Sequence, residues 1–275
     1  MSSQPVTVRA RRRLLRAANR ILGPTAVRHH LLSLRHRGPR SAYEPKEAFE
    51  RYHGTALAEG EFTDEGTIRK GHDPLRTRYH YNAVENAILE HFVVDGGARP
   101  TSVLDIGSGA GHWIEFYRGL LGAERVVGAE ISAPLAAALG EKYADDPGVS
   151  VVEIDVGSPD FSLDERFDVV NAIGVMFHLV DDDAWRRAVR NLGALLAPGG
   201  ALIVGGQFGR TTKDVGFKTG EAGELLVNKR IRSLRAWKGC AGEAGLEALA
   251  VHRTRKSRRI DTPENNILVL GRRPS

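Results

Sequence analysis

The sequence predicts an α/β fold in which a doubly wound, mostly parallel sheet of seven strands follows an N-terminal helical extension. Strand-like and helix-like segments alternate from residue 101 onward, which is typical of a parallel sheet with helices on both faces. A loop with three glycines at alternate positions follows the first of these strands. Two further apolar runs near the C-terminus complete the seven strands that we expect.

Turn and capping residues bound the expected elements. Asp183 and its neighbours suit a helix N-terminus, and Pro198, Gly199 and Gly200 predict a stop before the fifth strand. The strands are expected at 101–106, 125–130, 149–154, 167–173, 200–206, 246–251 and 267–270. The helices between them are expected at 111–121, 133–143, 182–196 and 228–244.

The chain of 275 residues is long enough for one large α/β domain with an additional segment. Residues 1–42 are expected to form a basic, amphipathic arm, because apolar residues recur at helical spacing among arginines. Residues 43–98 are expected to form a helical cap or lid, and residues 99–275 the α/β domain. Within the cap, we expect helices at 44–60 and 74–94 and a loop at 66–73.

Positive charge is concentrated in two places, although the formal net charge is only +5. The arm has no acidic residue before Glu44, and a second basic cluster covers residues 252–259. Such runs suit nucleic acid, anionic lipid or a phosphorylated substrate, but a solvated surface has the same composition. The charge pattern by itself therefore specifies no partner, and peripheral membrane contact of the arm stays open.

The single cysteine, Cys240, excludes an intramolecular disulfide framework and fits a reducing cytoplasm. No apolar run approaches the roughly 20 residues that cross a bilayer. We therefore expect a cytoplasmic protein without a transmembrane segment. No His/Asp pattern resembles a metal-ligand set, so no metal site is expected, and the oligomeric state is not indicated.

The glycine-rich loop carries the most specific signal in the chain. Asp105 lies near the end of the first predicted strand, and Gly107, Gly109 and Gly111 follow it at alternate positions. Glycines at this spacing allow a tight turn and a close approach of a polar ligand to the backbone at a helix N-terminus. His112 stands where a nicotinamide-binding loop requires Gly or Ala.

This acidic Gly-x-Gly-x-Gly pattern resembles that of class I S-adenosylmethionine-dependent methyltransferases, and the resemblance extends over about residues 73–275. It implies a Rossmann-like methyltransferase fold that binds S-adenosyl-L-methionine as methyl donor and releases S-adenosyl-L-homocysteine. It also implies that the glycine backbone approaches the methionyl part of the donor. Asp105 is then expected to hold the donor's ammonium group.

The same resemblance implies further donor contacts at the ends of the next strands. Glu130 is expected to accept both ribose hydroxyls, and Asp155 to meet the adenine amino group. Asn171, with the stretch up to Gly174, is expected to pass under the donor through its main chain. Three neighbouring residues complete the expected contacts, namely Ser108, Ile131 and Val156.

The acceptor side is expected to involve two segments. His178 follows the fourth predicted strand and is the candidate general base, which is needed only if the nucleophile arrives protonated. The segment from Gly71 to Asn82 is the candidate substrate-binding segment, with His72, Arg76, Tyr79, His80 and Tyr81. Secondary candidates near the strand ends are Arg230, Arg232, Trp237 and Asn265.

We therefore expect a methyltransferase acting on a small-molecule acceptor, by direct displacement and at oxygen. The preference for oxygen rests on His178 and on Asn171-Ala172-Ile173-Gly174, which lacks the Pro-Pro-aromatic motif of many amino-methylating enzymes. One alternative is an RNA methyltransferase that uses the basic arm and the 252–259 cluster for phosphate contacts. Another is a non-catalytic regulatory protein that binds the donor.

Overall fold

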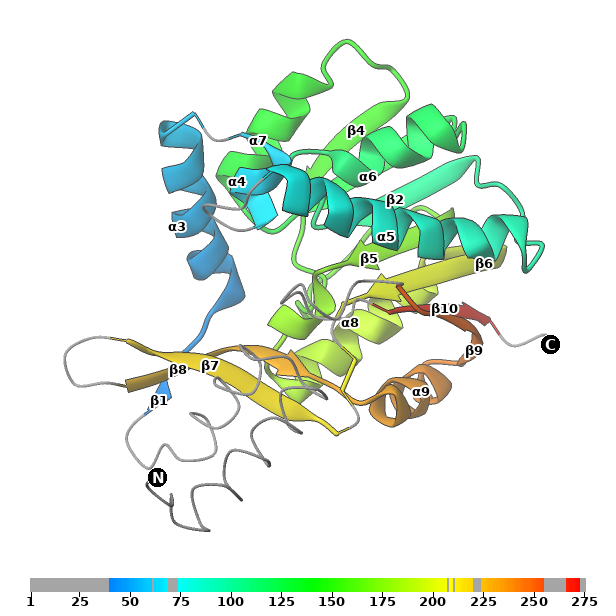
Figure 1. Cartoon of the computed structure of the whole chain (residues 1–275). Helices are drawn as coiled ribbons and strands as arrows, with labels where there is room; N and C mark the ends of the chain where they lie inside the picture. The colour runs from blue at the N-terminus through cyan, green and yellow to red at the C-terminus, as the bar shows by residue number, and fades with distance from the viewer. Residues whose placement is uncertain are drawn as a thin grey trace, which may run out of the picture.

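A computed structural model describes residues 40–60, 62–68, 74–206, 208–209, 211–219, 224–254 and 266–272 (Figure 1). Several sequence predictions lie outside these residues. They are the arm up to residue 39, the loop residues 69–73 with His72, the end of the basic cluster from residue 255, and Asn265.

The predicted seven-stranded, mostly parallel sheet is confirmed. Its strand order is β4-β3-β2-β5-β6-β10-β9, and only β10 runs antiparallel to its neighbours. The carboxyl ends of the parallel strands therefore meet at one edge. The strands are β2 (Ser102–Ile106), β3 (Arg125–Glu130), β4 (Val149–Glu153), β5 (Phe167–Ile173), β6 (Leu196–Gly205), β9 (Leu246–His252) and β10 (Ile267–Arg272).

Helices cover both faces of this sheet (Figure 1). Alternate residues of each strand point to opposite faces, so β2 contributes Val103 to one core and Leu104 to the other. The helices on the first face are α5 (Pro74–Val93), α6 (His112–Glu115) with the π-helical segment η1 (Phe116–Leu120), and α7 (Ala133–Lys142). Those on the second face are α8 (Asp182–Ala194) and α9 (Leu234–Glu243).

A second, three-stranded sheet was not expected. It has the order β1-β8-β7, with β1 (Arg40–Ser41), β7 (Lys213–Thr219) and β8 (Glu224–Ile231). The predicted helix at 228–244 is therefore wrong over 228–233, because β8 pairs antiparallel with β7. The helix α9 begins only after Ser233, whose side chain accepts a hydrogen bond from the Ala236 amide at 3.1 Å.

Two other boundaries differ from the prediction. The strand β6 begins at Leu196, four residues earlier than predicted. The Pro198–Gly200 turn lies inside this strand and is accommodated by a register shift against β5. The expected loop at 66–73 begins inside a short helix, α4 (Asp64–Ile68). Within the described residues, no helix is long and apolar enough to cross a membrane.

The helix α3 (Pro45–Ala58) connects the small sheet to the carboxyl edge of the large one (Figure 1). Pro45 suits its first turn, where no intrahelical N–H bond is required. The helix packs against α7, and Lys46 forms an ion pair of 2.6 Å with Glu153 at the end of β4. Because β4 ends beside the predicted donor site, α3 lies over that region of the sheet.

Candidate active site

The loop after β2 is shaped by its glycines. Gly107, Gly109 and Gly111 have φ angles of 70°, 59° and 98°, which side chains rarely adopt. A Cβ atom on Gly107 would lie 2.4 Å from a methyl group of Val175, and one on Gly111 would lie 2.4 Å from the Tyr143 hydroxyl. The Gly107 amide donates to the Ala129 carbonyl at 2.7 Å. The Val175 and Tyr143 side chains thus pack directly against the loop backbone, which only glycine allows at these two positions.

Asp105 is fully buried beneath this loop. One carboxylate oxygen, Oδ1, accepts a hydrogen bond of 2.7 Å from the Asn171 side chain, and the Tyr117 hydroxyl donates to Asn171 Oδ1 at 3.3 Å. The other oxygen, Oδ2, is buried and has no hydrogen-bond partner among the described residues. A buried, unpaired carboxylate oxygen is unfavourable, so Asp105 is suited to a cationic donor such as an ammonium group.

Glu130 is the second buried acid of the site. Its Oε1 atom accepts a hydrogen bond of 2.6 Å from the Gly109 amide, so the acid and the glycine loop are joined directly. The Ile131 amide also donates to this carboxylate. A carboxylate has about four lone-pair positions. Two donors therefore leave Glu130 able to accept hydroxyl groups, as expected for a ribose.

Burial disfavours the charged forms of both acids. It raises the pKa of Asp105 to about 6, although the hydrogen bond from Asn171 acts in the opposite direction. It raises the pKa of Glu130 to about 7, against the Gly109 hydrogen bond and together with the nearby Asp105 charge. A ligand with an ammonium group and hydroxyl donors would return both carboxyls to the ionised state.

His112 connects the glycine loop to the preceding helices α4 and α5 through its side-chain contacts. Its ring stacks on that of Tyr81, with the centroids 3.4 Å apart. Its Nδ1 lies 3.2 Å from Asp64 Oδ2, and its Nε2 lies 2.9 Å from Glu85 Oε1. Burial lowers the pKa of His112, but the hydrogen bond with Asp64 and the close contact with Glu85 outweigh this, so the net shift is upward. His112 therefore ties α4 and α5 to the loop.

The other residues predicted to contact the methyl donor differ in burial and in their hydrogen bonds. Asp155 is half-buried, and its Oδ1 accepts the Gly157 amide at 2.8 Å, which holds the turn after β4. Ser108 is buried and donates to the Asp105 carbonyl oxygen at 2.9 Å. Val156 is buried in the core, and Ile131 is half-buried after β3.

The residues of the predicted substrate segment differ in exposure, and none of its described residues lines the pocket described below. Arg76 is exposed, Tyr79 and His80 are half-buried, and His72 lies outside the described residues. Tyr81 is buried against His112 and Trp113, so it packs behind the loop rather than facing an open site. This burial argues against Tyr81 as an acceptor contact.

His178 lies at the end of the short helix η2 (Met176–His178), beneath α3. Its ring meets that of Phe49 edge-on at 4.9 Å, and its Nδ1 lies 3.5 Å from the Tyr43 hydroxyl. Nδ1 also lies 3.1 Å from the Asn228 carbonyl oxygen of β8. Because a carbonyl only accepts, Nδ1 carries the proton and Nε2 the lone pair. Neither Phe49 nor Tyr43 was identified from the sequence.

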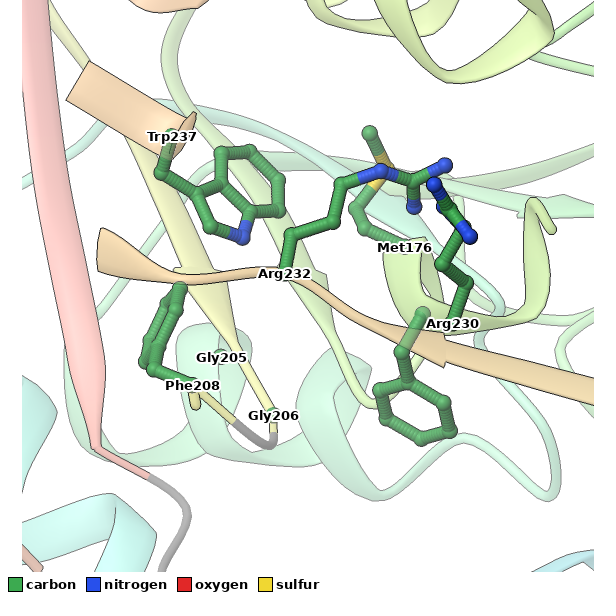
Figure 2. A pocket seen from close by; sticks show the side chains of 8 residues that line it. Met176, Gly205, Gly206, Phe208, Arg230, Arg232 and Trp237 are labelled. Atoms are coloured by element: carbon green, nitrogen blue, oxygen red, sulfur yellow. The ribbon is translucent and has the colours of Figure 1, made fainter. Parts of the chain in front are cut away.

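A pocket opens next to this histidine, at the carboxyl ends of β5 and β6 (Figure 2). Figure 2 shows Arg230 and Arg232 converging beside Met176, with Trp237 and Phe208 along the same cavity. The lining residues are Met176, Phe177, Gly205, Gly206, Phe208, Arg230, Arg232 and Trp237. Three of the secondary sequence candidates thus come together in one pocket.

The two arginines of the pocket are held by one acid. Asp182 accepts hydrogen bonds from Arg230 and Arg232, and the Arg232 guanidinium lies 4.3 Å from the centre of the Trp185 ring. Arg230 also pairs with Asp214. Arg232 Nη1 is buried and has no hydrogen-bond partner among the described residues. The pocket therefore offers aromatic surface and one buried unpaired N–H donor group.

Comparison with known proteins agrees with this geometry. Residues 103–200, which contain the glycine loop and both buried acids, match a sequence profile described as a methyltransferase domain. The chain carries a class I S-adenosylmethionine-dependent methyltransferase domain. A search of curated protein sequences finds no match for the chain.

Solved structures share the fold of this methyltransferase. The 1,6-didemethyltoxoflavin-N1-methyltransferase of Burkholderia thailandensis is 18% identical with a TM-score of 0.59, over 87% of this chain and 94% of that one. Magnesium protoporphyrin IX methyltransferase from Synechocystis is 14% identical with a TM-score of 0.58, over 85% and 100%. DhpI in complex with S-adenosylhomocysteine is 20% identical with a TM-score of 0.57, over 86% and 100%.

The methyl donor of this enzyme is S-adenosylmethionine, which supplies an electrophilic methyl group on a sulfonium. The described residues fit it, because Asp105 presents an unpaired buried carboxylate oxygen and the glycine loop has no Cβ atoms in the way. We propose that Asp105 binds the ammonium group, Glu130 the ribose, and Asp155 with Val156 the adenine. Asn171 then acts through its side chain on Asp105, rather than only through its main chain as expected.

Binding of S-adenosylhomocysteine is expected to release protons near pH 6.5. In the free methyltransferase the pKa values are about 6 for Asp105 and about 7 for Glu130, and the bound ammonium and hydroxyl groups favour the ionised forms. Affinity should then rise roughly 10- to 100-fold between pH 5.5 and pH 8 and level off above both pKa values.

Isothermal titration at pH 6.5 in buffers of different ionisation enthalpy measures this proton release directly. The apparent binding enthalpy should change with the buffer at pH 6.5 and depend on it much less at pH 8, where both carboxyls are already largely ionised and the ligand's amino group is still protonated. A buffer-independent enthalpy at both values would mean that neither acid changes its protonation on binding.

Proposed function

We propose that this methyltransferase transfers the methyl group to an oxygen of a small-molecule acceptor bound in the pocket between η2, β6 and α9. The observation that carries the proposal is the position of this pocket. Its wall at Met176 and Phe177 continues from Val175, whose side chain meets Gly107 of the donor loop. A ligand in the pocket would therefore lie close to the donor.

The lining of the pocket favours a small, partly aromatic acceptor, whose entry would require the lining side chains to move apart, because the cavity now has room for about one water molecule. Phe177, Phe208 and Trp237 provide apolar surface, and Arg232 Nη1 provides a buried donor that needs an acceptor oxygen. Two structures with the same fold are named for small-molecule substrates, 1,6-didemethyltoxoflavin and magnesium protoporphyrin IX. A cytoplasmic location, expected from the single cysteine, is part of the same proposal.

His178 is proposed to accept the hydrogen bond of the acceptor hydroxyl through Nε2. Burial lowers the pKa of His178 to about 3, with a further contribution from the charge of Lys229. The imidazole is therefore neutral at every pH above about 4, so Nε2 is free to accept a hydrogen bond from the acceptor hydroxyl. Methyl transfer to oxygen is a direct displacement, so holding the hydroxyl in line is the main requirement.

The helix α3 is proposed to act as a cap over this acceptor site, within the predicted cap segment 43–98. Phe49 and Tyr43 contact His178, and Lys46 connects the helix to Glu153 beside the donor site. Half-buried Tyr79 and His80 remain weaker candidates for contacts with the acceptor, since they follow the loop at 69–73.

Incubation with S-adenosylmethionine and a panel of phenols, alcohols, amines and transfer RNA tests the proposal, with release of S-adenosylhomocysteine as the readout. We expect methylation of a hydroxyl compound. For that acceptor, Phe177→Ala should raise KM about tenfold or more while the Kd for S-adenosylhomocysteine stays the same, because two to three kcal/mol of apolar contact is lost only from the acceptor. Phe92→Ala is the control, since Phe92 is a partly buried aromatic on α5 outside the pocket.

His178→Ala is expected to lower kcat for the hydroxyl acceptor by roughly 100-fold, because the hydrogen bond that holds the acceptor hydroxyl in line is lost. The wild-type kcat/KM should show no acidic limb from this residue between pH 5 and pH 8, because its pKa lies at about 3. Methylation of RNA or of an amine in place of any hydroxyl compound would contradict the proposal. So would an unchanged kcat in His178→Ala.

A further inference from the structure

A second cluster of ionisable side chains lies where the C-terminal end of α5 packs against β9. His91 is in the last turn of α5, Asp95 follows the helix, and His252 ends β9. One ligand atom from each of these three residues lies within 4.8 Å of the other two. None of the three belongs to the donor site or to the acceptor pocket.

Both histidines of this cluster are buried, with 9% of His91 and 8% of His252 exposed. His91 Nδ1 and His252 Nε2 have no hydrogen-bond partner among the described residues. His91 Nδ1 is 3.9 Å from Asp95 Oδ2, which is too far for a hydrogen bond. His252 Nε2 is 2.8 Å from the same oxygen, but the contact lacks the direction of a hydrogen bond. The two ring nitrogens thus lie close to the same carboxylate oxygen, and neither has a hydrogen-bond partner among the described residues.

Glu90 fixes the orientation of His252. Its Oε2 atom lies 3.0 Å from His252 Nδ1. With the proton on Nδ1 donated to Glu90, Nε2 carries its lone pair toward His91 and Asp95. A carboxylate behind a histidine in this way is the usual second contact of a metal-bound imidazole, because it sets the tautomer and raises the basicity of the ligand nitrogen.

We propose that His91 Nδ1, Asp95 Oδ2 and His252 Nε2 bind a divalent first-row transition metal ion, with zinc as the preferred ion. Imidazole and carboxylate ligands suit this class of metals. Bond lengths of about 2.0–2.2 Å place tetrahedral ligands roughly 3.3–3.6 Å apart. The distances of 2.8 and 3.9 Å from Asp95 to the two nitrogens lie on either side of that range. Water completes the coordination on the exposed side of Asp95.

Such an ion would be structural, because it joins the end of α5 to an outer strand of the sheet. No metal site is expected from the sequence, since His252 lies 162 positions after Glu90 and only the fold brings them together. The alternative is a metal-free network of ion pairs, in which a protonated His252 would contact both Glu90 and Asp95. It would leave the buried His91 Nδ1 without a hydrogen bond, which is unfavourable.

The test uses the full-length protein after treatment with a chelator. Binding of Zn²⁺ is measured by isothermal titration calorimetry, and binding of Co²⁺ is measured by visible absorption. We expect one ion per chain, the absorption bands of a four-coordinate Co²⁺ site, and a rise in Tm of roughly 5 °C at saturating Zn²⁺. His91→Ala/His252→Ala should abolish this stoichiometric binding and the rise in Tm. Glu90→Gln should weaken binding by about 10- to 100-fold.

Two further variants keep the result interpretable. Asp95 is exposed, so Asp95→Asn should fold normally and still lose the Co²⁺ bands. His80→Ala removes another histidine of α5 that is not in the cluster, so it should bind Zn²⁺ like the wild type. Absence of stoichiometric binding in the wild type would overturn the proposal. Equal binding in the wild type and in the double variant would do the same, because the ion would then lie elsewhere.

Discussion

Asp105→Asn is expected to weaken the binding of S-adenosylhomocysteine by about 10- to 100-fold, because a hydrogen bond to a charged group contributes about 1.5–3 kcal/mol. The substitution keeps the shape of the side chain but removes the negative charge opposite the ammonium group. An asparagine can still bond to Asn171, since both amides can rotate to pair a donor with an acceptor. The fold should therefore be retained while the affinity falls.

Asp168→Asn is the matched control for this experiment. Asp168 lies on the neighbouring strand β5, near its start and away from the glycine loop, where its carboxylate accepts hydrogen bonds from Thr101 and Ser102. Its loss should lower stability without changing the Kd measured by isothermal titration. Equal affinities of Asp105→Asn and the wild type would show that Asp105 does not contact the ligand.

Gly107→Ala is expected to lower the free energy of unfolding by about 2–5 kcal/mol and to abolish donor binding. Two costs combine at this position. A left-handed backbone conformation costs a non-glycine residue about 1–2 kcal/mol. In addition, the new Cβ would lie 2.4 Å from a Val175 methyl group, and such overpacking costs about 1–3 kcal/mol. Denaturant unfolding of the variant measures the sum.

Gly122→Ala separates the two costs of Gly107→Ala. Gly122 has a similar φ of 74°, but a Cβ there would meet nothing within 4 Å. It should therefore cost only the backbone term of about 1–2 kcal/mol. The double variant Gly107→Ala/Val175→Ala should recover the steric part, giving a coupling of about 1–3 kcal/mol in the double-mutant cycle. Zero coupling would exclude the clash as the reason for glycine.

The alternating part of the fold could be predicted because local patterns determine it. Each parallel strand is a short apolar run with a helix signal after it, and Asp181, beside the predicted cap Asp183, caps α8 through its side chain. The β7–β8 hairpin could not be predicted in this way. Leu225, Leu226 and Ile231 fit either a helix or a strand, and only pairing with β7 decides between them.

The proposed donor site could be predicted from the sequence because its acids lie at or near the ends of successive strands. Glu130 ends β3, and Asp105 is the last residue but one of β2. The contacts that support them depend on tertiary packing. Asn171 reaches Asp105 across 66 positions, and Tyr43 reaches His178 across 135. No local pattern indicates either pair, so the roles of Asn171 and α3 required the structure.

Isothermal titration of the wild-type protein with S-adenosylhomocysteine, and separately with a reduced nicotinamide dinucleotide, tests the central claim most directly. The glycine loop with Asp105 and Glu130 predicts binding of one S-adenosylhomocysteine per chain and no binding of the dinucleotide. Absence of S-adenosylhomocysteine binding at millimolar concentration, together with saturable binding of the dinucleotide, would contradict the account.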